Sequence, residues 1–330
     1  MSSDFDRLQP QLILDAIEAA GYRTTGEYSQ LNSYENRVFD VRLEIGREHL
    51  LARDPSTTAP IERVIAKFYR PHRWSAEAIR DEHEFLADLQ REGIPAIAPL
   101  PLKNGSTTIN KEGYELALFP RVVGRMPDEF LQGQLRQVGR TLARIHNIGA
   151  RRPALHRPDL TTEFFGWSAL ERLERFVYPE LWRRYEETCI EILEHIDEAI
   201  DPSSFLRIHG DCHKGNLLHS GTEFFFVDFD DFVNGPVIQD FWMLLSGSVD
   251  DDDIAAEEQE EICIGYEELR EIPDEWHLFD PLRALRIIHY AGWIAQRWND
   301  PFFKQIFPAF ETYNYWLDEL TQLEKIASHL

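Results

Sequence analysis

Cysteine is scarce in this sequence. Only three cysteines occur among the 330 residues, Cys189, Cys212 and Cys263, and they are widely spaced and odd in number. Such a set provides neither a disulfide framework nor a CxxC pair of zinc ligands. The scarcity excludes the disulfide-stapled secreted class, and we expect the protein to work in a reducing compartment, the cytoplasm.

Positive charge and long apolar runs are also in short supply. The chain carries 34 Lys and Arg against 58 Asp and Glu, a formal net charge of −24. This charge argues against general affinity for nucleic acid or an anionic membrane, but it permits a cationic substrate or partner. Runs such as 116–120 are too short to span a bilayer, and the opening MSSDFDRLQP lacks the pattern of a secretory signal. We expect a monomer with no nucleic-acid or membrane partner.

Hydrophobic residues, at 43% of the chain, are sufficient for one large or two fused domains. The first third predicts strands at 37–45, where apolar and polar residues alternate, and at 63–69 and 114–120. Between them, Ser75 is placed to cap a helix that ends at Gly93. This part of the chain is therefore expected to be rich in β-structure.

The pattern changes after about Gly124. Apolar residues at helical spacing predict a helix that ends at Gly149, and the segments 168–200, 255–270 and 281–298 are also helical in pattern. A short β-like insert, EFFFVDFDDF, interrupts them. We predict an α+β, two-lobed architecture, with a β-rich lobe at 1–120, a mostly helical lobe at 121–330 and a hinge near Phe119 and Val122.

The segment RIHGDCHKGNLLH is the densest group of reactive side chains. Its Asp211 is preceded by His209 and followed five positions later by Asn216, which matches the H-x-D-x-x-x-x-N spacing of a kinase catalytic loop. In such a loop the aspartate receives the proton of the acceptor hydroxyl, and the asparagine oxygen reaches a magnesium ion. The spacing alone is a weak signal, and HRPDLTTEF shows that partial matches arise by chance.

A zinc site is the alternative interpretation of this segment. His209, Asp211 and His213 would share one side of a strand, with Cys212 beside them. The two glycines of GDCHKGN make a poor strand, however, and no further ligand cluster accompanies it. The histidines are better interpreted as hydrogen-bonding supports of the loop.

A carboxylate after the buried run FFFV is placed to meet a metal ion. Asp228 has the position of the aspartate in the kinase DFG motif, although the glycine of that motif is absent. Asp230 and Asp231 follow closely, so they remain alternatives as metal-binding groups. Three successive phenylalanines indicate a buried strand, and the acids at its end are expected to face a cleft.

Lys67 lies within the apolar run VIAKF, which matches the strand lysine that contacts the α- and β-phosphates in kinases. A lysine in such a run needs a partner, because burial of an unpaired charge is costly. On the following helix Glu82 falls on the inward stripe, whereas Glu84 falls on the solvated face. Glu82 is therefore the predicted ion-pair partner of Lys67.

The loop that would cover the phosphates contains no glycine. LNSYENRVF, at 31–39, excludes a Walker A or G-x-G-x-x-G motif, but Ser33 and Glu35 lie in a turn whose backbone N–H and hydroxyl groups could reach phosphate. A plain hairpin is the other interpretation. Asp240 is predicted to cap a helix or to brace the backbone of the 207–219 loop. The acidic run at 249–261 is expected to be a solvated helix start or a wall that recognises cations.

Taken together, HGDCHKGN, VDFDD and NGPVIQDFWMLL resemble the aminoglycoside phosphotransferase and choline kinase-like branch of the protein-kinase-like fold. With LNSYENRVF and KFYRPHRW, they more closely resemble the bacterial stress response kinase A (RdoA) family, whose members act as serine/threonine protein kinases. The resemblance implies an ATP- and Mg²⁺-dependent kinase with a protein acceptor.

The resemblance also implies roles for individual residues. Ser33 would lie at the ATP loop, Lys67 on phosphate and Asp211 at the acceptor proton, while Asn216 and Asp228 would hold Mg²⁺. Adenine is then expected against the hinge, at Phe119 and Val122, and Glu35 beside the nucleotide. One departure stands out: His213 occupies the place where protein kinases usually carry lysine, and antibiotic and choline kinases share the histidine.

Three other functions stay open. One is a kinase for a small alcohol such as an aminoglycoside, choline or an amino alcohol. A nucleotide-binding regulator without catalysis and a zinc hydrolase are the two others.

Overall fold

The computed structural model describes residues 4–44, 61–245 and 252–330. The chain divides into two compact units. The N-terminal unit contains the described residues up to Thr141 together with Lys214–Asp230, and the C-terminal unit contains Leu142–His213 with Asp231–Leu330. The predicted α+β class is confirmed, whereas the predicted division at residue 120 stays a prediction.

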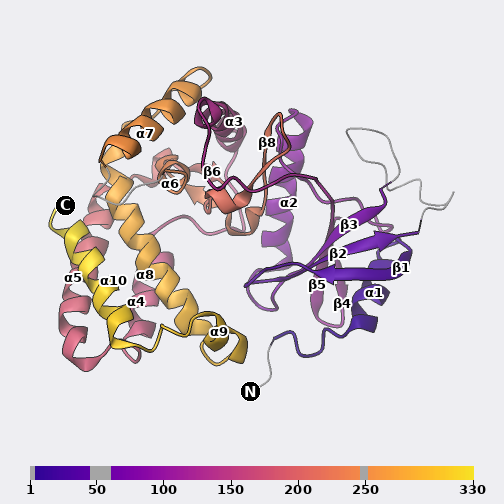
Figure 1. Cartoon of the computed structure of the whole chain (residues 1–330), viewed down its shortest axis with the longest axis horizontal. Helices are drawn as coiled ribbons and strands as arrows, with labels where there is room; N and C mark the ends of the chain where they lie inside the picture. The colour runs from indigo at the N-terminus through magenta and orange to yellow at the C-terminus, as the bar shows by residue number, and fades with distance from the viewer. Residues whose placement is uncertain (1–3, 45–60, 246–251) are drawn as a thin grey trace. The chain divides into compact units, whose positions relative to one another are not determined.

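The N-terminal unit is built on an antiparallel five-stranded sheet with the strand order β1-β2-β3-β5-β4 (Figure 1). Its strands are β1 (Thr24–Gln30), β2 (Arg37–Leu43), β3 (Arg63–Phe68), β4 (Ile109–Lys111) and β5 (Tyr114–Pro120). The three strands predicted from the sequence are β2, β3 and β5. A separate hairpin, β7 (Leu217–His219) and β8 (Phe224–Phe226), belongs to the same unit.

Two helices contribute to the cores on the two faces of this sheet. Helix α1 (Pro10–Ala19) shares a core with Leu116 and Leu118 of β5, while Ile79 of α2 (Ala76–Arg91) packs with Ala117. Alternate residues of a strand point to opposite faces, so these contacts place the two helices on opposite sides of β5. The Ser75 hydroxyl accepts the Ala78 N–H at 3.1 Å, which confirms the predicted cap.

The C-terminal unit is mostly helical. Its helices are α4 (Ser168–Leu173), α5 (Pro179–Ala199), α6 (Ile238–Trp242), α7 (Asp252–Glu267), α8 (Phe279–Arg297), α9 (Pro301–Ile306) and α10 (Tyr313–Ala327). Two short strands, β6 (Leu206–Ile208) and β9 (Val233–Gly235), pair with each other, and α3 (Gln134–Gly149) contains the boundary between the units. The single-turn elements of the chain are η1 (Glu163–Trp167), η2 (Pro202–Ser204), η3 (Lys214–Asn216), η4 (Phe229–Asp231) and η5 (Trp276–Leu278).

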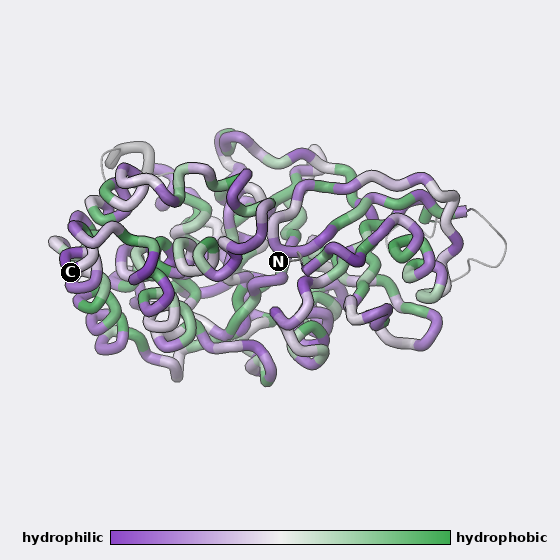
Figure 2. Tube along the Cα trace, turned by 90° about the horizontal axis from the view of Figure 1, so that it is seen from below, coloured by the Kyte–Doolittle hydropathy of each residue, from purple (hydrophilic) through white to green (hydrophobic). Residues whose placement is uncertain are grey.

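Helix α8 is the central helix of this unit and contacts α4, α5, α6 and α10. Its Gly292 allows a close crossing with α4, because a Cβ there would lie 2.5 Å from the Cβ of Ala169. The helices alternate hydrophobic and hydrophilic residues along their length, as Figure 2 shows. Their apolar faces bury Leu282, Leu285 and Ile288 of α8 in the core.

Residues 252–261 of the acidic run lie within α7, so the expected helix is present, although it begins at Asp252 and not at residue 255. Residues 249–251 lie outside the described residues. Over the described ranges, no helix is long and apolar enough to cross a membrane.

Stability is expected to fall as the pH rises from about 5 to about 7, because of a buried carboxyl between α5 and α10. The hydroxyl of Tyr185 donates to Glu319 Oε1 at 2.7 Å. Burial raises the pKa of Glu319 from 4.5 to about 7, although hydrogen bonds from Tyr185 and Tyr315 oppose the rise. The unfolded chain therefore releases this proton at a lower pH than the native protein does, and the native state loses about 3 kcal/mol across the interval.

Chemical denaturation of the wild type and of Glu319→Gln at pH 5 and pH 8 measures this effect. Glutamine still accepts from Tyr185 but has no proton to release, so the variant should lack most of the fall in unfolding free energy. An equal fall in both proteins would show that Glu319 does not titrate in this interval.

Candidate functional site

The loop that carries Asp211 begins at the end of β6 in the C-terminal unit. Gly210 has a φ of +81°, and a Cβ at this position would lie 2.3 Å from the carbonyl oxygen of Asp231. Both constraints require glycine. The chain therefore turns sharply between the paired strand β6 and Asp211, which fixes the backbone from which the Asp211 carboxylate projects.

Asp240, at the start of α6, braces this loop as the sequence predicted. Its two carboxylate oxygens accept the backbone N–H groups of His209 and Gly210, each at 2.8 Å. The fully buried His146 approaches the same carboxylate through Nε2 at 3.1 Å, and its Nδ1 lies 2.9 Å from the Tyr266 hydroxyl. These partners indicate that Nε2 carries the proton. Burial lowers the pKa of His146 although Asp240 opposes it, so the ring is neutral at pH 7.

Asp211 itself is held between two nitrogen donors. The Arg286 Nη2 of α8 donates to Asp211 Oδ1 at 2.7 Å, and the Nε2 of His213 lies 3.5 Å from Asp211 Oδ2. Burial alone would raise the pKa of Asp211, but Arg286 and then His213 outweigh it and hold the pKa below its ordinary value. The side chain is 15% exposed, so this ionised group is not completely buried.

Two histidines of the loop contact Asp211, His209 at its backbone and His213 at its carboxylate. His209 is fully buried, and its Nδ1 accepts the backbone N–H of Asp211 at 3.4 Å.

Within the described ranges, no group of three or more His, Cys, Asp or Glu residues is arranged to hold a metal ion. Cys212 is buried, and burial raises the pKa of its thiol well above the ordinary value. Such a thiol is neither a nucleophile nor a metal ligand at neutral pH.

In the N-terminal unit, Lys67 is the centre of a cluster of acids. The lysine lies on β3 between Val38 of β2 and Ala117 of β5. Its Nζ lies 3.5 Å from Glu82, the partner that helix geometry predicted, and 2.9 Å from Asp230. Burial lowers the pKa of Lys67, but Asp230 and Glu82 outweigh burial, and the net pKa lies well above the ordinary value. The ammonium group is therefore charged and fixed in direction.

Asp230 and Asp228 lie differently in this cluster. Asp230 has a side chain only 4% exposed, and it contacts Lys67, Arg73 and the Asn36 amide, whose Nδ2 donates at 3.1 Å. Asp228 is 54% exposed and lies 3.4 Å from Lys67 Nζ. Its φ of +59° is unusual for a residue other than glycine, and sets it in a sharp turn at the end of β8. The sequence left open which of these acids binds the metal ion. In the structure, both lie within 4 Å of the Lys67 ammonium group.

Asn216 and Asp228 lie at the same end of the β7–β8 hairpin. Leu217 pairs with Phe226, and the Val227 N–H donates to the Asn216 carbonyl at 3.0 Å. Asn216 thus directly precedes the hairpin, and Asp228 is the second residue after its end. Their side chains offer amide and carboxylate oxygens, the hard donors that Mg²⁺ prefers, so the donor set fits the predicted metal.

The glycine-free loop between β1 and β2 is tied to the end of β3. The backbone N–H of Arg70 donates to Asn36 Oδ1 at 3.0 Å, and Arg70 Nε lies 2.9 Å from Glu35 Oε1. Ser33 lies in the same loop and is half-buried. The sequence named Ser33 and Glu35 but not Arg70, which fixes the loop. Arg70 lies 35 residues from Glu35 in the chain, so no local sequence pattern pointed to it.

The two predicted hinge residues follow each other closely in the chain. Phe119 lies in β5 opposite Ile65, and its ring meets His83 edge-on at 6.0 Å. Val122 comes after the strand, and both side chains are partly exposed. The roles of these residues, like those of Ser33 and Glu35, stay predictions.

The predicted residues thus fall into two sets. Asp211 belongs to the C-terminal unit, and Ser33, Glu35, Lys67, Glu82, Phe119, Val122, Asn216 and Asp228 belong to the N-terminal unit. The chain passes from one unit to the other between His213 and Lys214, within the predicted catalytic loop.

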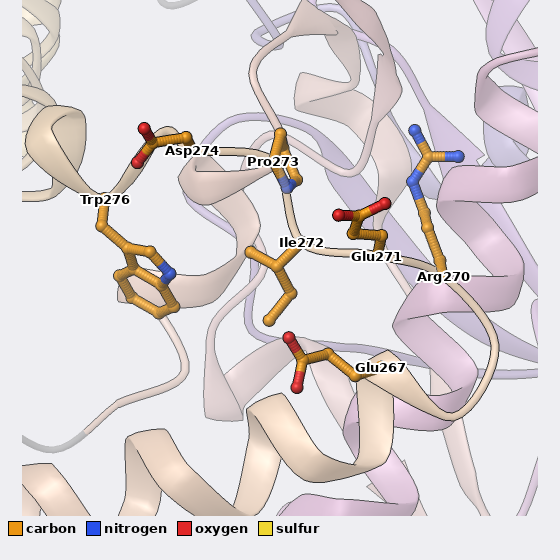
Figure 3. Close-up of a pocket in the computed structure, with 7 residues that line it drawn as sticks. All are labelled: Glu267, Arg270, Glu271, Ile272, Pro273, Asp274 and Trp276. Atoms are coloured by element: carbon orange, nitrogen blue, oxygen red, sulfur yellow. The ribbon is translucent and has the colours of Figure 1, made fainter.

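A cavity of about 660 Å³ lies elsewhere in the C-terminal unit. Figure 3 shows its lining residues, Glu267, Arg270, Glu271, Ile272, Pro273, Asp274 and Trp276. It contains none of the predicted site residues.

Replacing Lys67 by methionine is expected to lower the free energy of unfolding by about 3–5 kcal/mol, because Glu82 and Asp230 remain buried without their ammonium partner. Urea denaturation at pH 7 measures the loss. The exposed Lys103→Met in the same unit is the control and should change stability by less than about 0.5 kcal/mol. Equal stability of the two variants would show that the acid cluster does not depend on Lys67.

The chain matches known proteins over most of its length. The Phosphotransferase enzyme family (APH) matches residues 28–276. Stress response kinase A of Salmonella choleraesuis is 36% identical over 324 residues, which cover 96% of this chain and 92% of that protein. The serine/threonine protein kinase RdoA of Salmonella typhimurium has the same identity and coverage, and stress response kinase A of Escherichia coli is 35% identical over 95% of this chain and 90% of that protein.

Solved structures share the fold at lower identity. Amicoumacin kinase hAmiN, in complex with AMP-PNP, Ca²⁺ and Ami, has a TM-score of 0.73 at 18% identity, covering 99% of this chain and 94% of that one. A microcompartment-associated aminopropanol kinase has a TM-score of 0.69 at 20% identity, covering 97% and 96% of the two chains. The kinase-like fold expected from the sequence motifs is confirmed.

Proposed function

We propose, since this chain belongs to the phosphotransferase enzyme family, that it is an ATP- and Mg²⁺-dependent kinase whose acceptor is a serine or threonine hydroxyl of a protein. The observation that carries the protein acceptor is the 36% identity over 96% of the chain with relatives named stress response kinase A and serine/threonine protein kinase RdoA. The kinase chemistry is supported by the separate geometries of Asp211 and Lys67.

In the proposed reaction, the acceptor oxygen forms a bond to the γ-phosphorus while the bond from that phosphorus to the β,γ-bridging oxygen breaks. The products are a phosphoester and ADP, and the hydroxyl proton passes to Asp211. Asp211 is suited to this task because its carboxylate is ionised and its backbone is fixed by Asp240. Orientation of the hydroxyl, rather than strong basicity, is its contribution.

On the nucleotide side, Lys67 would contact the α- and β-phosphates, with Glu82 holding its direction. The loop with Ser33 and Glu35 would cover the phosphates, and Phe119 and Val122 would contact adenine. Asn216 and Asp228 would hold Mg²⁺, which when bound neutralises phosphate charge. Because Lys67 is already paired with Glu82, Asp228 and Asp230, bound phosphates would compete with these carboxylates for its ammonium group.

A small-molecule kinase is the second candidate, favoured by the likeness of the fold to the amicoumacin and aminopropanol kinases. Incubation with γ-labelled ATP and Mg²⁺, followed by separation of protein from small alcohols, tests the two. Label on serine or threonine of protein supports the proposal, and label only on amino alcohols or an aminoglycoside supports the alternative. Thermal stabilisation by ATP without ATP consumption would indicate a regulator that does not catalyse.

A further inference from the structure

Arg286 places a guanidinium group beside Asp211, in addition to keeping that carboxylate ionised. The guanidinium lies 2.7 Å from Asp211 Oδ1 and is 29% exposed, so it borders the same surface as the carboxylate. Any hydroxyl that reaches Asp211 brings its neighbouring groups close to Arg286. An acceptor with an ammonium group beside its hydroxyl would meet a like charge there, whereas an acceptor with a carboxylate would meet an opposite one.

The charge continues along one face of α8. Arg286, Tyr290, Trp293 and Arg297 are spaced by four, three and four residues, so they form one stripe of partly exposed side chains, named here the α8 stripe. The Tyr290 and Trp293 rings stack at 5.4 Å, with guanidinium groups over them at 5.9 Å for Arg286 and 5.0 Å for Arg297. The stripe therefore joins two cations through two aromatic rings.

Helix α9 and the residue after it hold these rings in place. Trp293 packs against Phe303 at 5.0 Å and Phe307 at 5.9 Å, and Tyr290 meets Phe307 at 6.1 Å. Rings fixed in this way lose little conformational entropy when a ligand binds. The stripe is a preformed surface with one end at Asp211.

We propose that the α8 stripe binds the acceptor and selects an acidic polypeptide segment. This inference rests on the proposed phosphoryl transfer and deepens it by naming the substrate class. Arg286 recognises a carboxylate next to the acceptor serine or threonine, and the aromatic pair packs against the segment beyond it. Arg297 recognises a second carboxylate farther along.

The length of the stripe fixes the spacing of the two carboxylates. Arg286 and Arg297 are separated by eleven residues of helix, about 16 Å at 1.5 Å per residue. An extended peptide covers that distance in about five residues at 3.3 Å each. The second acid is therefore expected about five residues from the first.

The net charge of −24 opposes acidic ligands at long range. Ionic screening confines that repulsion to about 8 Å at physiological salt. The groups within contact distance of the acceptor therefore determine whether an acidic or a cationic acceptor is preferred. A cationic acceptor of the choline or aminoglycoside kind is disfavoured by the same groups.

The test compares serine peptides that differ only in having glutamate or lysine beside the serine. With γ-labelled ATP, the wild type should prefer the glutamate peptide by at least about tenfold in kcat/KM. Arg286→Gln should abolish the preference and Arg286→Glu should invert it, whereas a variant that only disturbs the fold would lower the rates of both peptides equally. The exposed Arg183→Gln on α5 removes the same charge away from Asp211 and should keep the preference.

Arg297→Gln gives a second, independent readout. It should weaken transfer to a peptide whose only acid lies about five residues from the serine, and leave the peptide with an adjacent acid unchanged. A wild type that prefers the lysine peptide, or that labels only cationic alcohols, overturns the inference while phosphoryl transfer stands. Failure of the wild type to transfer phosphate to any peptide or alcohol would instead contradict the proposed function.

Discussion

Replacing Asp211 by asparagine is expected to lower kcat for phosphoryl transfer by about 10²–10⁴-fold, with the KM for ATP nearly unchanged. Asparagine keeps the shape of the side chain but cannot receive the hydroxyl proton. It also directs an amide N–H₂ toward either Arg286 or the acceptor, which disfavours the reactive orientation. Steady-state kinetics with a saturating acceptor separate the two parameters.

The loop itself should survive this substitution, because Asp240 and not Asp211 anchors its backbone. Asp318→Asn, at an exposed position of α10, is the matched control and should leave kcat unchanged. Retention of more than a tenth of wild-type kcat by Asp211→Asn would remove Asp211 from the mechanism.

The charge state of Asp211 adds a check on pH dependence. Arg286 and His213 hold the pKa of this carboxyl below its ordinary value of 3.8, against the effect of burial. Its contribution to stability is therefore complete above pH ~4 and is lost only as the pH falls through the lowered pKa. Asp211 should cause no loss of rate between pH 8 and pH 5.

Replacing Asp240 by alanine is expected to lower the free energy of unfolding by about 3–5 kcal/mol and to abolish measurable transfer. The carboxylate is fully buried and accepts from the His209 and Gly210 N–H groups and from His146. Its removal leaves three buried donors without acceptors, and each uncompensated donor is costly. Freed from the brace, the loop no longer holds Asp211 in one direction.

Asp240→Asn refines this prediction. An amide has one acceptor oxygen, so one of the two backbone N–H groups would face an N–H₂ group and the loss should be smaller, about 1–3 kcal/mol. Both the free energy of unfolding and the transfer rate should be lowest for the alanine variant, intermediate for the asparagine variant and highest for the wild type. A stability within about 0.5 kcal/mol of wild type for the alanine variant would contradict the role of Asp240 as the brace.

Local patterns predicted those elements whose sequence carries a clear period. Alternation gave β2, and the Ser75 cap with Gly93 gave α2. Strand β1 was not predicted, because all of its residues are exposed or half-exposed and no alternation of apolar and polar residues marks it. Helix α1 also went unpredicted, although Pro10 at its first position and its buried apolar residues provide a helical signal.

The residues of the candidate site were likewise predictable only where a local sequence spacing marks them. Asp211 and Asn216 are linked by a short fixed spacing, and Glu82 follows from the helix period, so the sequence could select them. Arg286 could not be selected, because its partner Asp211 is 75 residues away and only the fold brings the two together. The difference between Asp228 and Asp230 depends on a local turn with positive φ, which alternation in the sequence does not encode.

The stoichiometry of phosphate transfer by the wild-type protein shows whether this chain is a protein kinase. With γ-labelled ATP, Mg²⁺ and the glutamate-flanked serine peptide, we expect one phosphoserine for each ADP produced, and no transfer when Mg²⁺ is chelated. ADP formation with label released only as inorganic phosphate, or transfer that continues without a divalent metal, would contradict it.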